Sequence, residues 1–513
     1  MNKVIKGTSL LLLTSIIVKV LSAIYRIPFQ NLVGNEGFYI YQQVYPLYGL
    51  GMTIALSGVP VYLSKYAVEY QFDLKKLREI YTLLFIIGLV CFSVLFFGAH
   101  GLAVAMGDIR LKPLIQVAAL IFLLSPYLAL YRGVFQAELE LRPTALSQLV
   151  EQTTRVGVIL IAAYVLVSLQ VNLYTIGTVA MLGSVAGSAL ALFVLMKWGF
   201  TKQKMYFQFA KPSKETLKHF CTDGLLLICF VSFLLLFQLI DSFVIVNQLQ
   251  AAQFSTSVSQ NLKGIYDRGQ PMIQVGLVCT TVFLQALLPL LSHAVVNKQP
   301  DVFRHYKELV YKLLWLILLP ITLGLFVLMP EINWMLFDNT EGTAALRIFS
   351  LAVFFMSSLQ CFQTIEQSLR KTRHLWGALL VGLVVKYIAT YFFVFYYQII
   401  GASLGTICGL VAANLWYVLW NQKELGSSNF FKWRYLIVLV SYTICLVVYQ
   451  SLGMPLIHSR MSASIFAFFG IVINGIILVL IVIRGGYFTN DELASLPFGN
   501  KLKYLMRNGN ENR

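Results

Sequence analysis

The sequence has few charged residues and no motif that would support catalysis or nucleotide binding. Charged residues make up 12% of the 513 positions, about half of the roughly 25% found in soluble domains. The six histidines are dispersed, the seven cysteines have no metal-ligand spacing, and no glycine-rich phosphate loop occurs. These absences argue against an enzyme, a resident metal or organic cofactor, and an ATP-driven pump. The lack of an aromatic-interleaved basic domain argues against nucleic acid as a partner.

Long apolar runs dominate the chain instead. Hydrophobic residues make up 58% of it, and the mean hydropathy is +0.75. A helix that crosses a bilayer needs about 20 apolar residues, and on this criterion we predict an all-α integral membrane protein with fourteen spans. The predicted spans are 8–26, 38–63, 81–104, 114–135, 144–169, 174–197, 222–247, 267–294, 312–335, 345–369, 375–398, 400–421, 434–452 and 463–484. The connecting loops are short, so the function should lie within the helices.

Positive charge fixes the predicted orientation. The chain carries a net charge of +17, and most of its Lys and Arg fall in alternate connections, for example at 75–78, 197–218 and 370–373. Cytoplasmic loops of membrane proteins are enriched in these residues and border the anionic lipids of the inner leaflet. We therefore predict a multi-pass protein of the bacterial cytoplasmic membrane, with both termini in the cytoplasm. No signal-peptide cleavage site follows the first apolar run, which is read as a retained span.

The two halves of the chain share faint similarities at one offset. Phe-Gln-Ala at 135–137 recurs as Phe-Gln-Thr at 362–364, and Ile-Gly at 176–177 recurs at 400–401, each about 225 residues later. Six spans per repeat is an even number, so the copies would share one orientation and form a parallel pseudo-repeat. We predict two six-helix lobes with two helices appended.

The predicted organisation follows from that repeat. It comprises an N-lobe at 1–198, a cytoplasmic linker at 199–219, a C-lobe at 220–422, two further spans within 423–485 and a cytoplasmic tail at 486–513.

Three basic residues, Lys19, Arg155 and Lys386, lie inside long apolar runs. A cation at bilayer depth costs from roughly 3 to over 10 kcal/mol, so such residues normally face a polar cavity and mark a substrate path. The sequence therefore predicts a cationic chamber within a helical bundle and the transport of an anion.

Neighbouring residues leave alternatives open at some of these positions. Arg26 follows Lys19 by seven residues and shares its helix face, but Arg26 could also snorkel to the interface. Glu151 and Arg155 are spaced i,i+4, which favours a structural ion pair slightly over direct substrate contact. Lys386 has no acidic residue within a helical turn and is the better candidate for a cavity cation.

Spans two, seven and eight supply further polar candidates. Span two contains the tyrosines Tyr39, Tyr41, Tyr45 and Tyr48, and an interfacial belt is their ordinary interpretation. Gln42 and Gln43 fit better against a cavity or a moving neighbour. Asp241 lies in span seven, and the adjacent Asp267 and Arg268 could form an interfacial pair at the start of span eight.

Several of these segments resemble a known group of proteins. Residues 19–28 (Lys-Val-Leu-Ser-Ala-Ile-Tyr-Arg-Ile-Pro), Gly-Asn-Glu-Gly at 34–37 and Tyr-Pro-Leu at 45–47 resemble the opening of the polysaccharide biosynthesis and stage V sporulation protein B group. That group belongs to the MOP superfamily of exporters. Asp-Arg at 267–268 and Leu-Pro-Leu-Leu-Ser at 288–292 are similar to the eighth span of the lipid II flippase (MurJ) family.

The resemblance implies a V-shaped pair of lobes around a cationic cavity that opens alternately to each side. It also implies a flippase for an undecaprenyl-pyrophosphate-linked glycan, in peptidoglycan, capsule or spore-wall biogenesis, with cell-wall synthesis machinery as a partner. By resemblance, the basic substrate-binding positions fall on Lys19, Arg26 and Arg268. The sequence departs from the flippases at Leu50, where they carry arginine, and at Gly37, where an acidic residue is expected.

Two further expectations concern the energy source of transport and the other functions that the sequence allows. Membrane potential, Na⁺ or H⁺ would drive the cycle, with Glu151, Asp241 and Asp267 as candidate coupling residues. A multidrug/cation antiporter of the same superfamily is the main alternative, although its site should be acidic rather than basic. A lipid-linked glycan polymerase is disfavoured because the chain lacks a long external loop, and a non-transporting scaffold stays open.

Overall fold

The protein is helical throughout the part that the structure describes. The computed structural model describes residues 2–203, 207–369, 373–422, 431–453, 455 and 457–496, and no strand occurs in these ranges. The predicted tail at 486–513 lies mostly outside them. An all-helical chain satisfies its backbone hydrogen bonds internally, as a protein surrounded by lipid must.

The elements in chain order are α1 (Asn2–Ile24), α2 (Arg26–Leu56), α3 (Gly58–Glu69), α4 (Leu74–Phe97), α5 (Ala99–Ala105), η1 (Ile109–Leu111), α6 (Lys112–Ala119), α7 (Ile121–Ala137), α8 (Leu141–Ser168), α9 (Leu173–Gln203), α10 (Lys214–His219), η3 (Phe220–Gly224), α11 (Leu225–Val231), α12 (Phe233–Ala251), α13 (Thr256–Asp267), α14 (Gly269–Val296), α15 (Pro300–Leu313), η4 (Leu314–Leu318), α16 (Leu319–Val327), α17 (Met329–Phe337), α18 (Thr343–Ser350), α19 (Ala352–Leu369), α20 (Arg373–Trp420), α22 (Trp433–Gly453), α23 (Arg460–Arg484) and α24 (Asn490–Ala494). The short elements η3 and η4 are π-helical and η1 is a 3₁₀-helix.

Twelve helical stretches among the described residues are long and apolar enough to cross a membrane. Two of them, Leu13–Glu69 with 57 residues and His374–Trp420 with 47 residues, far exceed the roughly 20 residues that one crossing needs. Both contain an interior break, at Gly34 with φ 71° and at Gln398 with φ 52°. The multi-pass membrane class is therefore confirmed, while the exact count of fourteen spans stays a prediction.

The chain divides into two compact units. The first holds residues 1–267 with 394–398, and the second holds 268–393 with 399–513. The first unit thus includes α11, α12 and α13. The predicted lobes at 1–198 and 220–422 describe sequence repeats rather than compactness, and they stay a prediction.

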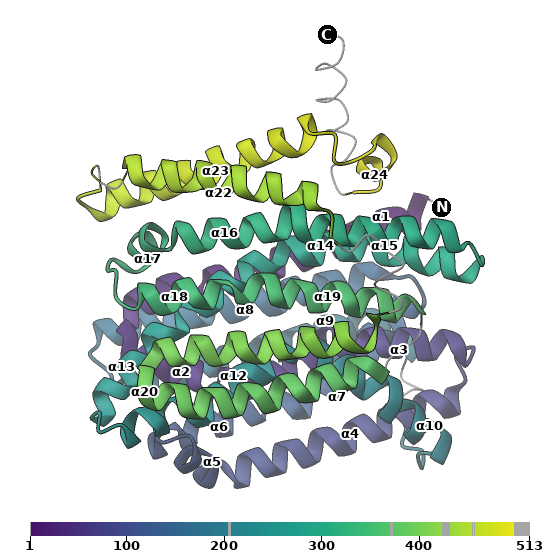
Figure 1. The fold of residues 1–513 in the computed structure, drawn as a ribbon. Helices are drawn as coiled ribbons and strands as arrows, with labels where there is room; N and C mark the ends of the chain where they lie inside the picture. The colour runs from purple at the N-terminus through teal and green to yellow at the C-terminus, as the bar shows by residue number, and fades with distance from the viewer. Residues whose placement is uncertain are drawn as a thin grey trace. The chain divides into compact units, whose positions relative to one another are not determined.

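In the first unit, α2 occupies the middle of the packing. It contacts α6, α7, α8, α9, α12 and α13, and α8 packs along α9 (Figure 1). The core around α2 is built from buried side chains such as Phe29, Phe38, Ile40 and Tyr48. A helix that is apolar on most of its surface is buried among others, and this places the polar side chains of α2 inside the unit.

In the second unit, α14 packs on α15 and α19, and α16 packs on α18. The last two long helices, α22 and α23, pair with each other and lie along α16 and α17 (Figure 1). Many of their outward side chains are exposed and apolar, including Ile444 and Phe468 at 58% and 62%. Such surfaces are expected of helices that face lipid.

Candidate functional site

Arg26 is buried at the junction of α1 and α2 without an ion-pair partner. α1 ends at Ile24 and α2 begins at Arg26, so the arginine lies where the chain turns between two helices. Its side chain is 0% exposed, and its guanidinium carbon lies 4.2 Å from the centre of the Tyr45 ring. None of its three nitrogens has an acceptor in good hydrogen-bonding geometry, although the Tyr25 hydroxyl lies close enough to interact with the guanidinium group. Arg26 therefore does not snorkel to the interface, which removes that alternative.

Arg155 reaches the same tyrosines from α8. It is 2% exposed, and it donates hydrogen bonds from Nη2 to Tyr25 Oη (3.1 Å) and from Nη1 to Tyr48 Oη (3.4 Å). The Tyr25 and Tyr41 hydroxyls lie 3.2 Å apart. Both arginines lie near the rings of Tyr25 and Tyr45, at 4.2–6.0 Å. The structure thus brings together two of the predicted site residues.

We call this group the arginine–tyrosine cluster; its members are Arg26, Arg155, Tyr25, Tyr41, Tyr45 and Tyr48. Neither arginine forms an ion pair with a carboxylate of the described chain. Removing an ion from water costs several kcal/mol even after relaxation, and cation–π contacts return only about 2 kcal/mol each when desolvated. The cluster therefore holds two positive charges that a buried anion would stabilise.

The same tyrosines correct the interpretation of span two as an interfacial belt. Tyr39, Tyr41 and Tyr48 are 0% exposed and Tyr45 is 8% exposed. The i,i+4,i+7 spacing of Tyr41, Tyr45 and Tyr48 places them on one helix face, which is turned to the arginines. This spacing is visible in the sequence, but tyrosine is so common at membrane interfaces that the interfacial interpretation was preferred.

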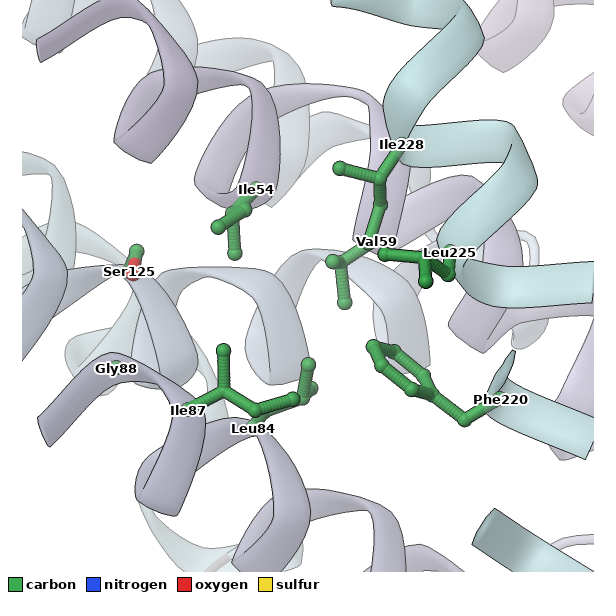
Figure 2. A pocket seen from close by; sticks show the side chains of 9 residues that line it. All are labelled: Ile54, Val59, Leu84, Ile87, Gly88, Ser125, Phe220, Leu225 and Ile228. Carbon is green, nitrogen blue, oxygen red and sulfur yellow. The ribbon is translucent and has the colours of Figure 1, made fainter. Parts of the chain in front are cut away.

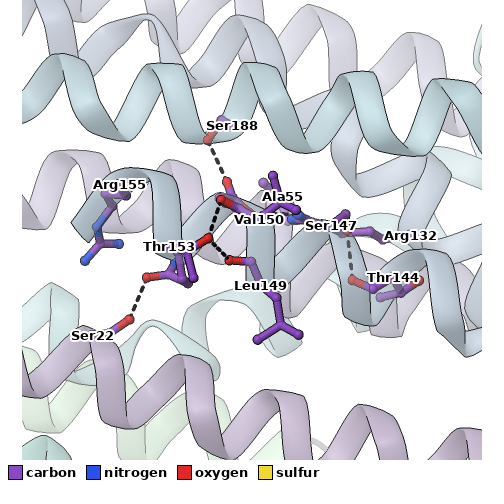
Figure 3. A network of polar contacts seen from close by, with 12 residues as sticks. Ser22, Ala55, Arg132, Thr144, Ser147, Leu149, Val150, Thr153, Arg155 and Ser188 are labelled. Carbon is purple, nitrogen blue, oxygen red and sulfur yellow. Dashed lines mark hydrogen bonds and ion pairs between the residues drawn. The ribbon is translucent and has the colours of Figure 1, made fainter. Parts of the chain in front are cut away.

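A second polar network on α8 fixes Glu151. Glu151 Oε2 accepts a hydrogen bond from Arg132 Nη2 at 2.8 Å, and both side chains are 0% exposed. Ser188 donates to the other carboxylate oxygen at 2.6 Å. Figure 3 shows Ser188 and Ser22 approaching α8 from opposite sides. The expected i,i+4 pair of Glu151 with Arg155 is therefore wrong, because Arg132 on α7 occupies the carboxylate and Arg155 binds tyrosines.

Arg132 is a buried polar residue that sequence reasoning missed. It also donates to Ser147 Oγ (3.1 Å) and to the Ala55 carbonyl (3.0 Å), so each of its three nitrogens donates a hydrogen bond. It lies within the predicted span 114–135, and the cost of a charge in an apolar run applies to it as it does to Arg155. The same criterion would have found it.

Two glycines let α9 approach α8 next to these networks. A Cβ on Gly187 would lie 2.5 Å from the Glu151 carbonyl oxygen, and one on Gly183 would lie 2.8 Å from the side chain of Val158. Gly183 and Gly187 form a small-xxx-small motif, which allows close helix packing in membranes. This contact holds the α8 backbone that carries Glu151 and Arg155.

The acidic candidates Asp241 and Asp267 are both buried in the first unit. Lys263 Nζ lies 2.6 Å from both carboxylate oxygens of Asp267, and the pair is nearly fully buried. Asp241 accepts a hydrogen bond from the Tyr266 hydroxyl at 3.1 Å. Lys263 was not among the predicted site residues, although its i,i+4 spacing to Asp267 is a readable signal.

The remaining basic candidates are carried by α1, by α20 and by the residue before α14. Lys19 is exposed on α1. In the second unit, Arg268 donates to Asn339 Oδ1 at 2.6 Å and approaches the Glu341 carboxylate at 3.9 Å. Lys386 is 0% exposed and donates to the Thr406 hydroxyl at 2.7 Å. Their roles in substrate binding stay predictions.

Polar contacts also hold α13 to the rest of the first unit. The Asp108 carboxylate accepts hydrogen bonds from Tyr174 on α9, from Gln260 on α13 (2.8 Å) and from Arg110 (3.0 Å). A Cβ on Gly264 would lie 2.1 Å from the Asn35 carbonyl oxygen, so α13 and α2 touch at their backbones. We call this group of contacts, made by Asp108, Tyr174, Gln260, Arg110 and the Gly264–Asn35 backbone approach, the Asp108 end of the unit.

No metal site was found in the ranges that the structure describes, since no three His, Cys, Asp or Glu side chains come close enough together there to hold an ion. The chemistry that the described site offers is charge recognition by guanidinium groups and tyrosine hydroxyls.

Sequence comparison places the chain among polysaccharide biosynthesis proteins, whose family pattern matches residues 4–295. The chain is 37% identical to the uncharacterized membrane protein YabM of Bacillus subtilis (strain 168), over 99% of this chain and 97% of that protein. The lipid II flippase MurJ and the stage V sporulation protein B of the same organism are 22% and 24% identical, each over 83% of this chain and 84% of its relative. The resemblance inferred from residues 19–28 and 267–292 is thereby confirmed.

Solved structures agree on the fold. A lipid II flippase MurJ in an inward closed conformation matches with a TM-score of 0.69 at 13% identity, over 93% of this chain and 99% of that one. A multidrug resistance MATE family transporter of the MOP superfamily, in an inward-facing conformation, matches with a TM-score of 0.63 at 15% identity, over 80% and 95%. The predicted all-helical transporter fold is confirmed.

Proposed function

The chain belongs to the polysaccharide biosynthesis protein family, and from this premise we propose that it moves an undecaprenyl-pyrophosphate-linked glycan from the inner to the outer leaflet of the bacterial cytoplasmic membrane. The cargo would be lipid II or another precursor of a cell-envelope polysaccharide. Two of its relatives carry the names lipid II flippase and stage V sporulation protein B, which supports a role in wall or spore-envelope assembly.

The observation that carries this proposal is the arginine–tyrosine cluster. Arg26 and Arg155 are buried, lie near the same two tyrosine rings and form no ion pair among the described residues. A pyrophosphate diester carries about two negative charges, and guanidinium groups bind phosphate through charge-assisted hydrogen bonds. Such bonds are stronger in a low-dielectric interior than in water. The unused donors of Arg26 would be satisfied by phosphate oxygens.

The cluster must open before it can bind cargo, because Arg26 is 0% exposed. The contacts at the Asp108 end hold α13 against α2 and α9, and we propose that they separate when the site opens on that side. On the orientation inferred from positive charge, the Asp108 end faces outward. An alternating-access cycle would make and break these polar contacts, and each hydrogen bond to the Asp108 carboxylate contributes about 1.5–3 kcal/mol net.

The membrane potential is sufficient to drive such a cycle. Each elementary charge that crosses the membrane is worth about 2.3 kcal/mol per 100 mV, so export of two negative charges from a negative interior is favourable by about 4–5 kcal/mol for each 100 mV. Coupling to Na⁺ or H⁺ through Glu151, Asp241 or Asp267 is a further proposal. Glu151 is fully occupied by Arg132 and Ser188, which favours a structural role for it.

A test of this function compares three cargoes in proteoliposomes that contain the purified protein. We expect lipid II or a non-peptidoglycan undecaprenyl-pyrophosphate glycan to reach the opposite leaflet faster than in protein-free vesicles, and an imposed potential of the favourable sign to accelerate the movement. A cationic dye serves as the third cargo. Efflux of the dye without movement of either lipid would contradict the proposal. It would favour the alternative of a multidrug/cation antiporter, whose fold is also similar to that of this chain.

A further inference from the structure

Gln30 is a buried amide one helical turn from Arg26. Both residues lie in the part of α2 that precedes the break at Gly34, and their i,i+4 spacing places them on one helix face, about 6 Å apart along the axis. Gln30 is 4% exposed, and its Oε1 has no hydrogen-bond donor among the described residues. The helix face that carries Arg26 therefore also carries a buried acceptor that the chain itself does not satisfy.

The other end of the Gln30 amide is held in place. Its Nε2 donates to Asn35 Oδ1 at 2.9 Å, and Asn35 Nδ2 donates to Asn261 Oδ1 on α13 at 3.3 Å. Because the amide is planar, fixing the nitrogen on Asn35 directs the oxygen away from Asn35. Asn35 lies on α2 itself, so the bond between Gln30 and Asn35 does not depend on the contact of α2 with α13.

The unsatisfied atoms of this helix face describe a ligand. A buried polar atom without a partner is unfavourable, and such atoms in folded proteins commonly have a functional explanation. The guanidinium nitrogens of Arg26 need acceptors, whereas Gln30 Oε1 needs a donor one turn further along α2. Phosphate oxygens of a pyrophosphate diester supply acceptors only. A sugar bonded to that diester supplies donors as well, through its hydroxyl groups or through the N–H of an N-acetyl group.

The apolar pocket that the first unit also contains does not suit a sugar. Its volume is about 90 Å³, and Figure 2 shows Ile54, Val59 and Leu84 in its wall. Its polar wall residue, Ser125, already donates its hydroxyl to the Phe122 carbonyl at 3.3 Å. Sugar hydroxyls in this pocket would be buried without partners, which is unfavourable. The polar contacts of a sugar are better provided beside Arg26.

We infer that Gln30 recognises the sugar of the cargo, its Oε1 accepting a hydrogen bond from a hydroxyl or an N-acetyl N–H of the sugar bonded to the pyrophosphate at Arg26. This inference rests on the proposed function. One helical turn is comparable to the separation between a phosphate and the polar groups of the sugar that it carries. A site that hydrogen-bonds one group of its substrate rejects ligands that lack the group, because the protein atom is then left unpaired. Gln30 is thus a specificity-determining residue.

The test measures equilibrium binding of three undecaprenyl pyrophosphate diesters to the full-length protein in nanodiscs. The diesters carry the same charge and end in a methyl group, in glucose or in N-acetylglucosamine. We expect at least one sugar diester to bind about tenfold more tightly than the methyl diester, as one well-placed hydrogen bond allows. Tight binding of both sugars would identify a hydroxyl as the donor, and tight binding of N-acetylglucosamine alone would identify the N–H.

Substitution of the amide tests the role of Gln30 directly. Gln30→Met removes the amide at nearly constant volume, so the preference for the sugar should fall to within about twofold. The affinity for the methyl diester should stay unchanged, which also shows that the variant is folded. Gln30→Leu is a second variant of the same kind. Gln116→Met is the matched control, because Gln116 is a half-buried amide on α6 that donates to the Phe96 carbonyl at 3.4 Å; it should keep the preference.

Three results would overturn the inference, and they can be told apart. Equal affinities for the three diesters in the unsubstituted protein would show that the Gln30 oxygen does not contact the sugar. A preference that survives in Gln30→Met would place the sugar contact on another residue. Failure of all three diesters to bind would remove the phosphate contact as well, and it would contradict the proposed function together with this inference.

Discussion

Arg26→Ala and Arg155→Ala each reduce translocation of an undecaprenyl-pyrophosphate glycan by roughly 10- to 100-fold; this is the result we expect in proteoliposomes. The physical reason is the loss of charge-assisted hydrogen bonds to the pyrophosphate, each worth about 1.5–3 kcal/mol in a buried site. The double variant should be inactive. Arg26→Lys should be intermediate, because lysine keeps the charge but loses the planar stacking on the Tyr45 ring.

These substitutions should leave the protein folded, which separates them from ordinary destabilisation. Neither arginine has a carboxylate partner whose charge would be left buried and unpaired. The expected cost is the lost packing of one side chain and, for Arg155, the loss of its hydrogen bonds to Tyr25 and Tyr48. Arg304→Ala, at a side chain that is 60% exposed on α15, controls for loss of a positive charge. Translocation at the unsubstituted rate in the Arg26→Ala/Arg155→Ala protein would show that the cluster does not bind the cargo.

Arg132→Ala destabilises the protein by about 3–5 kcal/mol, which is the largest stability effect that we expect from a single substitution. The change leaves the Glu151 carboxylate buried at 0% exposure without its cation, and breaking one side of a buried ion pair typically has this cost. The measurement is thermal unfolding of the purified protein, together with its yield in the membrane fraction.

A paired substitution shows whether the missing partner is the cause. In Arg132→Met/Glu151→Leu both charges are gone and the volume is roughly kept, so the unfolding temperature should return to near that of the unsubstituted protein. Glu151→Gln alone should be milder than Arg132→Ala, because the amide is neutral and can still accept a hydrogen bond from Ser188. If the double variant were as unstable as Arg132→Ala, the ion pair would not explain the loss.

The membrane class and the buried position of Arg155 were readable from the sequence because both follow from the energy of burial. Long apolar runs need lipid or a core, and a charge such as Arg155 within one of them needs a special environment. Exposure was harder to predict: the spacing predicts that Lys19 and Arg26 share a helix face, yet α1 ends at Ile24, Lys19 is exposed and Arg26 at the start of α2 is fully buried. Helical spacing predicts which residues share a helix face, but it does not show whether that face packs against other helices or is exposed.

Which charged side chains pair with each other could not be predicted from the sequence either, because it depends on how the helices pack. The i,i+4 spacing favoured Glu151 with Arg155, but packing of α7 on α8 brings Arg132 to the carboxylate, and a tertiary contact of this kind has no local signal. Lys263 and Asp267 are the opposite case, since their local spacing does match the pair that forms. The tyrosines of α2 were misjudged because a residue suited to the membrane interface is equally suited to holding a buried guanidinium group.

Binding of a charge series tests the central claim most directly. Undecaprenyl pyrophosphate, undecaprenyl phosphate and undecaprenol share one tail and differ only in headgroup charge, and their affinities for the purified protein in nanodiscs can be compared by equilibrium binding. If Arg26 and Arg155 form an anion site, the affinity should fall in that order, by about tenfold or more between the pyrophosphate and the alcohol, and the difference should vanish in Arg26→Ala/Arg155→Ala. Equal affinities for all three lipids in the unsubstituted protein would contradict the account.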